Sequence, residues 1–456
     1  MSESGDFLFS KDELVPISTS RLPVEPPPPP APRLRMAERK QIEFFEASLD
    51  DLVDREHVVR TIWNTVCKYD LTPWLVGIRA VEGTVGRDHT DPRILLSLWI
   101  LATVQGVSSA REVDRLCREH LAYRWLCGGV SVNYHLLADF RSKGLEQLDQ
   151  LLTHIVASLM KEGLVSLDRV SHDGVRVRAN AGCNSFRRAP TLKECLEAAK
   201  KRLKELKEQA ELPTDNQQSR SAQMRAAEEA VARIQASLEE CKVLDQDRQE
   251  HTNKKNEKRE RKAVRVSTTD KDARVMKFHG GGFHPGANIQ ICTANDSRII
   301  VAVEATNCVG DANLLSPILL QIAQRYGEMP KEAIVDGGYS TIADIETVTA
   351  MNVVVYAPLK DEDKQLSEGK NPYARKKGDS DAVADWRQRM GYDQSKAIYK
   401  ERGSTVEWAN AQVKNRGLQQ MPVRGKPKWQ CIALLHAITN NFVQAIYLRK
   451  QAKMAK

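Results

Sequence analysis

The chain has 456 residues, of which 41% are hydrophobic and 28% are charged. This composition is typical of a folded protein of about two to four domains, and it excludes a single small module. The formal net charge of +8 has the sign expected for a polyanionic partner such as nucleic acid. No apolar run reaches the roughly 18 residues of a membrane span, no signal peptide is evident, and the nine cysteines include no CxxC pair. We therefore expect a cytoplasmic protein with reduced thiols and no membrane span.

The first part of the chain predicts a tail followed by helices. Residues 1–37 are rich in proline, and we expect a disordered or polyproline-like segment there. Residues 38–163 show helical periodicity, with Asp91, Ser109 and Asn133 placed as N-caps. An all-helical N-terminal domain follows, and its short helices fit either a DNA-binding helix-turn-helix or a plain helical core.

Residues 191–264 predict an insertion built as a coiled-coil helical hairpin. Apolar residues step by four and three in two stretches, and a break around Pro213 folds the pair back on itself. The first seam consists of Leu192, Leu196, Ala199, Leu203, Leu206 and Ala210, and the second of Met224, Ala227, Val231, Ile234, Leu238 and Cys241. The insertion ends in a basic run for which we predict contact with DNA phosphates, through Lys254, Lys255, Lys258, Arg259 and Arg261.

The segments on either side of the insertion, residues 164–190 and 265–425, predict an α/β domain. Short β-branched runs indicate a mixed five-stranded sheet with helices. These runs are 165–177, 289–293, 299–303, 333–335 and 353–357. Further helices are expected at 311–325, 341–351 and 399–416, and we expect residues 426–456 to form a C-terminal helix packed on this core.

Three acidic residues stand where they could carry chemistry. Asp173 lies within the first long strand, Asp336 follows an apolar strand and precedes two glycines, and Glu407 lies on a helix. Lys414 falls seven residues after Glu407 and therefore on the same helical face. Converging carboxylates need a cation between them, and hard oxygen ligands favour Mg²⁺ or Mn²⁺. Two such ions would support phosphodiester chemistry.

Other polar residues near these acids have simpler interpretations. Asp311 is expected to cap the helix that follows it, and Asp344 is expected to be solvated. We interpret His172 as a packing neighbour of Asp173, with a metal or general-base role as the alternative. His279 and His284 lie in a glycine-rich turn and are interpreted as structural.

These motifs together resemble the DDE-class transposases of bacterial insertion sequences. The resemblance rests on HDGVRVRANAG around Asp173, IVDGGYS around Asp336 and YKERGSTVEWANAQVK around Glu407. It implies a catalytic core similar to RNase H, with Asp173, Asp336 and Glu407 as the metal-binding triad. Tyr399, Arg402 and Lys414, which match a Tyr-Arg-Glu-Lys signature with Glu407, would hold DNA phosphates. Four residues separate Arg402 from Glu407, one more than usual, so Arg402 is expected to lie off the face of the glutamate.

The sequence therefore predicts a DNA transposase that cleaves the ends of its own element and joins them to target DNA. The implied partners are double-stranded DNA, both inverted-repeat ends and target, and a second copy of the chain in a homodimer. Alternatives are a DNA-binding protein whose catalytic core has decayed or been repurposed, an unrelated metal-dependent nuclease, and a coiled-coil adaptor.

Overall fold

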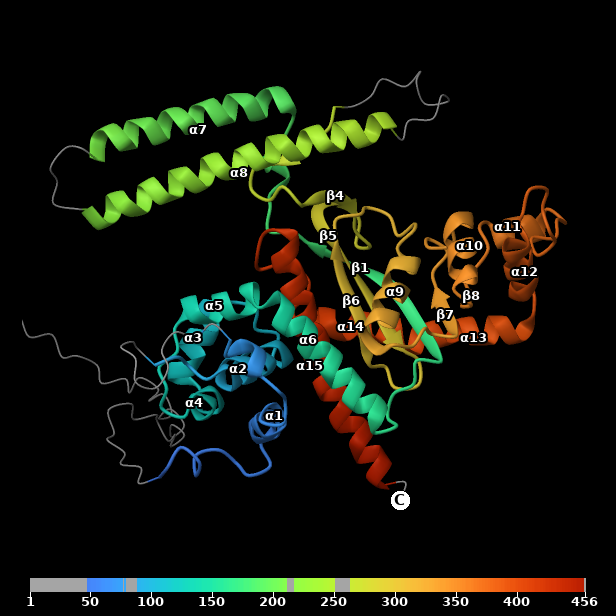
Figure 1. Cartoon of the computed structure of the whole chain (residues 1–456), viewed down its shortest axis with the longest axis horizontal. Coiled ribbons are helices and arrows are strands. Elements are labelled where there is room, and N and C mark those ends of the chain that lie inside the picture. The colour runs from blue at the N-terminus through green and yellow to red at the C-terminus, as the bar shows by residue number, and fades with distance from the viewer. Residues whose placement is uncertain (1–46, 77, 79–87, 211–216, 251–262, 455–456) are drawn as a thin grey trace, which may run out of the picture. The chain divides into compact units, whose positions relative to one another are not determined.

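A computed structural model gives the structure of the chain and describes residues 47–76, 78, 88–210, 217–250 and 263–454 (Figure 1). The compact unit that carries all the described elements begins at Ser48. The proline-rich segment 1–37 and the basic run 254–261 lie outside the described residues, so the predictions made for them stay predictions.

In the part of the chain that the structure describes, six α-helices precede the first strand. Asp91, Ser109 and Asn133 accept hydrogen bonds from backbone N–H groups at the starts of α2, α3 and α5, as expected of N-caps. The helices are α1 (Val58–Val66), α2 (Pro92–Val104), α3 (Ala110–Glu119), α4 (Leu121–Cys127), α5 (Tyr134–Lys143) and α6 (Leu145–Lys161), and a 3₁₀ turn spans Thr72–Trp74.

A mixed sheet forms the centre of the fold. Its strands are β1 (Arg169–Arg178), β4 (Arg274–Lys277), β5 (Phe283–Ala294), β6 (Ile300–Thr306), β7 (Glu332–Val335) and β8 (Val354–Tyr356). The strand order is β4-β5-β1-β7-β8, and β6 also pairs with β5. β1 is antiparallel to β5 and parallel to β7. The five predicted strands correspond to β1, β5, β6, β7 and β8. The sheet has six strands, so the prediction of five was wrong by one. The strand that the sequence did not reveal is β4, which has only four residues and pairs with β5.

Two long helices are inserted in the chain between β1 and β4. They are α7 (Ala189–Ala210) and α8 (Gln217–Glu250), and they pack along each other (Figure 1). A 3₁₀ turn (Cys183–Ser185) and a small two-stranded sheet of β2 (Phe186–Arg187) and β3 (Val266–Ser267) lie at their base. Leu192, Cys241, Val264 and Val266 form a small core of their own there. The packing of α7 and α8 is thus separate from the main core.

Most of the remaining helices pack on the sheet. These remaining helices are α9 (Leu315–Tyr326), α10 (Ile342–Ala350), α11 (Glu362–Ser367), α12 (Asp381–Met390), α13 (Asp393–Ser404), α14 (Val406–Asn415) and α15 (Lys426–Met454). Helix α13 contacts β7 and β8, and α14 contacts β1 and β5. The pair α13–α14 therefore crosses the sheet where β1 and β7 run side by side.

Helix α15 joins the helical region to the sheet. It packs on α2, α5 and α6 and also on β6, and its central residues are buried. Side-chain amides of α15 bond the backbone of β6: Asn441 accepts from the N–H of Ile300 at 2.8 Å and donates to its carbonyl at 2.7 Å. These bonds satisfy a strand edge that would otherwise be unpaired. Among the described residues α15 alone is long and apolar enough to cross a bilayer, but 78% of that stretch is buried in the protein, as in a core helix.

Candidate active site

Two of the three predicted acids lie beside each other in the middle of the sheet, where β7 ends next to β1. In the parallel pairing of β1 with β7, His172 is opposite Val335, so the next residues along each strand are Asp173 and Asp336. β7 ends at Val335, and Asp336 begins the turn in which its Oδ1 accepts from the N–H of Gly337 at 2.8 Å. The parallel pairing therefore delivers both carboxylates to the same place.

The third acid meets the first through Arg402. The Arg402 guanidinium lies 2.9 Å from the Asp173 carboxylate and 2.5 Å from the Glu407 carboxylate. The Asp173 side chain is 19% exposed and that of Glu407 is 51% exposed, so the pair reaches from the protein interior to solvent. One arginine thus forms ion pairs with carboxylates from β1 and from α14.

A break between two helices makes this contact possible. Helix α13 ends at Ser404 and α14 begins at Val406, and Thr405 between them has φ −114° and ψ −93°. The Thr405 hydroxyl bonds the Ser171 hydroxyl of β1 at 3.0 Å, which fixes the break against the sheet. The expectation that Arg402 lies off the face of Glu407 assumed one continuous helix. That expectation was wrong, because Arg402 lies on α13 and Glu407 on α14, and the break between the two helices lets their side chains form an ion pair.

The electrostatics of the cluster follow from burial and from the shared arginine. Burial raises the pKa of Asp173, the positive charge of Arg402 opposes that rise, and the negative charge of Asp336 adds to it. Burial disfavours the charge on Arg402, but Asp173 and Asp336 outweigh it and raise the pKa of the guanidinium. Asp336 therefore stabilises the positive charge of Arg402, as Asp173 and Glu407 also do.

The predicted phosphate-binding residues are arranged around this cluster. Tyr399 is half-buried on α13, and burial raises its pKa, with the charges of Arg402 and Asp336 also acting on it. Lys414 is exposed in the last turn of α14, two turns from Glu407. The structure thus brings Tyr399, Arg402 and Glu407 together and places Lys414 further along the same helix.

Asn410 contacts the site and was missed in the sequence. Its side-chain amide donates to the Asp173 carboxylate at 2.9 Å, and its Oδ1 is buried without a hydrogen-bond partner. It lies three residues after Glu407, one helical turn along α14. The three-residue spacing indicates that Asn410 lies on the same face of the helix as Glu407. Its contact with Asp173 could not be predicted, because that contact depends on how α14 packs on β1.

Asp311 was assigned the wrong role. It does not cap α9, where Asp344 instead accepts from the backbone N–H groups of Leu315 and Ser316 at 3.2 Å. Asp344 is accordingly buried rather than solvated. Asp311 accepts from the Asn288 amide at 2.7 Å and so joins a polar cluster behind the acids.

This cluster also explains the glycine that follows Asp173. A Cβ at Gly174 would come within 2.7 Å of the side-chain amides of Asn288 and Gln290. Tyr339, in the turn after Asp336, donates its hydroxyl to Gln290 at 2.6 Å. The HDG and DGGY motifs are therefore parts of one packed unit beneath the acids.

His172 has the packing role that we expected. It is fully buried against the Tyr339 ring, at 4.7 Å between ring centroids. Burial lowers its pKa to about 3, so the imidazole is neutral at physiological pH. His284 in the glycine-rich turn packs against Phe278, consistent with a structural role.

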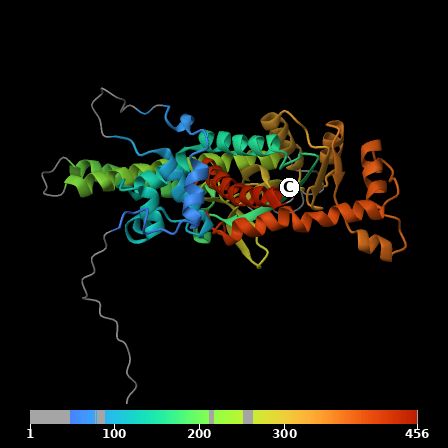
Figure 2. The same ribbon diagram turned by 90° about the horizontal axis from the view of Figure 1, so that it is seen from below.

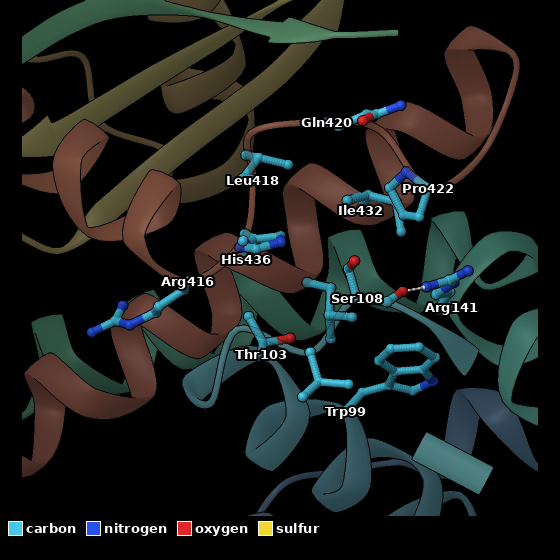
Figure 3. Close-up of a pocket in the computed structure, with 13 residues that line it drawn as sticks. Trp99, Thr103, Ser108, Arg141, Arg416, Leu418, Gln420, Pro422, Ile432 and His436 are labelled. Carbon is cyan, nitrogen blue, oxygen red and sulfur yellow. Dashed lines mark hydrogen bonds between the residues drawn. The ribbon is translucent and has the colours of Figure 1, made fainter. Parts of the chain in front are cut away.

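A second candidate cavity has none of the features of this site. It lies between α2, α5 and the α14–α15 connection, with room for about one water molecule (about 10 Å³). Its lining includes Trp99, Arg141, Arg416 and His436 and no acidic residue. Figure 3 shows the guanidinium groups of Arg141 and Arg416 at opposite ends of the cavity, so they do not converge on one ligand.

The acid cluster fits a divalent ion in its donor type. Carboxylate oxygens are the ligands that Mg²⁺ and Mn²⁺ prefer, and Asp173 and Glu407 already meet at one positive group. Among the residues that the structure describes, no three His, Cys, Asp or Glu side chains are gathered as a ready metal cluster. The carboxylates are instead arranged around Arg402.

Two protein-family models match the chain. Residues 47–143 match a Transposase domain (DUF772), and residues 242–442 match a Transposase DDE domain. No curated protein and no solved structure gives a significant match. The second match contains Asp336 and Glu407, whereas Asp173 precedes it because α7 and much of α8 intervene.

These matches agree with the structure. A DDE domain implies an RNase H-like fold, and the mixed sheet with helices on it is consistent with that fold. Enzymes of this class are polynucleotidyl transferases that act on DNA and use divalent metal ions. The helical region and the mixed sheet fall within this pattern, and the chain belongs to the DDE-class DNA transposases of insertion sequences.

Proposed function

We propose that this transposase hydrolyses phosphodiester bonds at the ends of its own element and joins the freed 3′-hydroxyls to target DNA. Asp173, Asp336 and Glu407 are the proposed catalytic residues and metal ligands. The observation that supports this proposal is the pairing of Arg402 with both Asp173 of β1 and Glu407 of α14, together with the position of Asp336 beside Asp173 at the end of β7.

The cofactor that we propose is a pair of Mg²⁺ or Mn²⁺ ions held by these carboxylates. Two such ions activate an attacking oxygen and stabilise the leaving oxygen of a phosphodiester. The residues of the chain orient the site: Asn410 holds the Asp173 carboxylate, and Thr405 fixes the helix break that presents Glu407. In this proposal the chain forms no covalent intermediate with DNA.

The DNA contacts are proposed on both sides of the acids. Tyr399, Arg402 and Lys414 would hold phosphates near the cleaved bond, and the basic run 254–261 would hold phosphates further along the duplex. We further propose that residues 38–163 bind DNA, that 191–264 form a coiled-coil arm, and that a cytoplasmic homodimer brings two ends of double-stranded DNA together.

Conservative replacement of the acids tests the catalytic assignment. Asp173→Asn, Asp336→Asn and Glu407→Gln should each reduce cleavage of a duplex carrying the element end by at least about 10³-fold, because each removes a negatively charged oxygen ligand. Binding of the same duplex should change less than about threefold. The measurements are single-turnover cleavage with Mg²⁺ or Mn²⁺ and fluorescence anisotropy for binding.

Asp168→Asn is the matched control, since Asp168 is an exposed acid just before β1 that pairs with Lys331. It should leave cleavage unchanged. If the unaltered protein binds the end but never nicks it with either metal, the chain is a decayed or repurposed DNA-binding protein. If it cuts any duplex equally well, it is a general nuclease.

A further inference from the structure

The hairpin of β4 and β5 extends past the acids. In the antiparallel pairing of β1 with β5, Asp173 is opposite Ile291, and Phe283 at the start of β5 lies eight residues further along. At about 3.3 Å per residue this is a reach of roughly 26 Å. β7 ends just before Asp336, so the hairpin continues beyond the end of β7, where the acids lie. Figure 2 shows it in yellow, standing out from the neighbouring elements.

The strand register places part of the hairpin on the same side of the sheet as Asp173. Side chains of directly opposed residues share a face, and the face alternates along each strand. Ile291 is opposite Asp173, and Phe283 lies an even number of residues from Ile291 on β5. Lys277 and Val275 on β4 are opposite Phe283 and Pro285, so they lie on that same face.

This face combines apolar and positive groups. Phe283 is 66% exposed and Val275 is 44% exposed, and the exposed Lys277 makes no ion pair with any residue that the structure describes. The whole stretch 273–294 contains no Asp or Glu, although Arg274, Lys277, His279 and His284 lie within it. Such a surface is complementary to a polyanion that also offers flat apolar groups.

The hairpin is anchored where it meets the sheet. The Arg176 guanidinium, three residues after Asp173, donates to the backbone carbonyl of Lys277 at 2.7 Å. Arg274 forms an ion pair with Glu240 of α8. Gly281 and Gly282 have φ of +91° and +77°, which lets the tip turn tightly and leaves Phe283 uncovered.

We propose that this hairpin face binds the DNA held at the acids, with Lys277 contacting a phosphate and Phe283 stacking on a terminal or unpaired base. DNA is favoured over a second protein chain because the face has no acidic residue and its free charge is positive. The inference rests on the proposed function, since it places the hairpin along the same DNA that the acids cleave.

Single substitutions at the exposed face test the proposal. Phe283→Ala should weaken binding of the element-end duplex by about tenfold, because one base–aromatic stack is lost, and Phe283→Trp should restore it. Lys277→Ala should lower the slope of log Kd against log salt by about one. Tyr447→Ala is the matched control, because Tyr447 is an aromatic residue on α15 that is 53% exposed, and it should have no effect.

The outcomes separate this inference from the proposed function. If the unaltered protein cleaves the element end while Phe283→Ala and Lys277→Ala bind as tightly and with the same salt slope, the hairpin inference alone is overturned. If Phe283→Ala leaves DNA binding intact but dissociates a dimer in sedimentation without DNA, the face binds a second copy of the chain. If the unaltered protein neither binds nor cleaves DNA, both proposals are overturned.

Discussion

Asp173 receives two donors that come from far along the chain. Arg402 on α13 and Asn410 on α14 both contact its carboxylate, at 2.9 Å each. The two contacts differ in kind: Arg402 is positively charged and forms an ion pair, whereas Asn410 is neutral and orients the carboxylate through a hydrogen bond. Hydrogen bonds around a ligand carboxylate commonly set how well it binds a metal. In the proposed function, Asn410 would therefore position the carboxylate of the metal ligand Asp173.

Replacing Asn410 by Ala should weaken Mn²⁺ binding by about tenfold, because the Asp173 carboxylate loses the amide that orients it. Mn²⁺ binding to the DNA-free protein can be measured by calorimetry. Asn415→Ala, at the exposed end of the same helix, is the control and should bind Mn²⁺ normally. A change in melting temperature without a change in Mn²⁺ affinity would contradict the positioning role.

The two buried histidines predict how stability depends on pH. Burial lowers the pKa of His172 and of His436 to about 3, against about 6.5 in an unfolded chain. Below pH 6.5 the unfolded state takes up protons that the folded state cannot. Stability is therefore fully present above pH 6.5 and is lost as the pH falls toward 3, by up to about 1.4 kcal/mol per pH unit for each histidine.

His436→Gln should remove about half of that histidine-dependent loss. Urea unfolding at pH 7, 6 and 5 measures it, and the variant should show a shallower fall in the free energy of unfolding than the unaltered protein. His279→Gln replaces an exposed histidine and should leave the profile unchanged. Equal slopes in all three proteins would show that His436 does not remain neutral on folding.

At the scale of elements, the helices α7 and α8 are stabilised mainly by each other. Leu192, Leu196 and Leu206 are buried on α7, while the neighbouring charged side chains are exposed. Their small core at the base is separate from the main one. The pair should therefore be able to open without unfolding the sheet.

Leu206→Asp should open the far end of this pair, because it buries a carboxylate in an apolar seam at a local cost of about 2–4 kcal/mol. Limited proteolysis should become several-fold faster within 190–250, and the melting temperature of the remainder should hold. Lys207→Asp places a carboxylate at the exposed neighbouring position and should not change the proteolysis rate. Global unfolding of Leu206→Asp would contradict independent opening.

On the scale of the whole molecule, the sequence predicts what depends on local pattern and misses what depends on packing. The placement of Asp336 was predictable because a β-branched run ends there and glycines follow. The roles of Asp311 and Asp344 could not be read locally, because Asp344 caps a helix that begins 29 residues before it. Likewise, the contact of Arg402 with Glu407 depends on a helix break that Ser171 of a distant strand helps to fix.

The hydrogen bonds from Asn441 of α15 to the edge strand β6 also depend on packing between distant parts of the chain. Asn441→Leu should lower the free energy of unfolding by about 2–6 kcal/mol, because the N–H and carbonyl of Ile300 would both be buried without a partner. Urea unfolding measures this. Tyr447→Leu, at an exposed position of the same helix, should cost less than about 1 kcal/mol. A similar loss in both variants would contradict the role of the amide.

The position of α15 in the chain has a consequence for biosynthesis. A ribosome makes residues 426–454 after every element that this helix ties together. Until they leave the exit tunnel, the nascent polypeptide exposes the outer border of β6 and the apolar surfaces of α2, α5 and α6. Premature termination between Glu407 and Lys426 would thus yield an aggregation-prone fragment, even though it would retain all three acids.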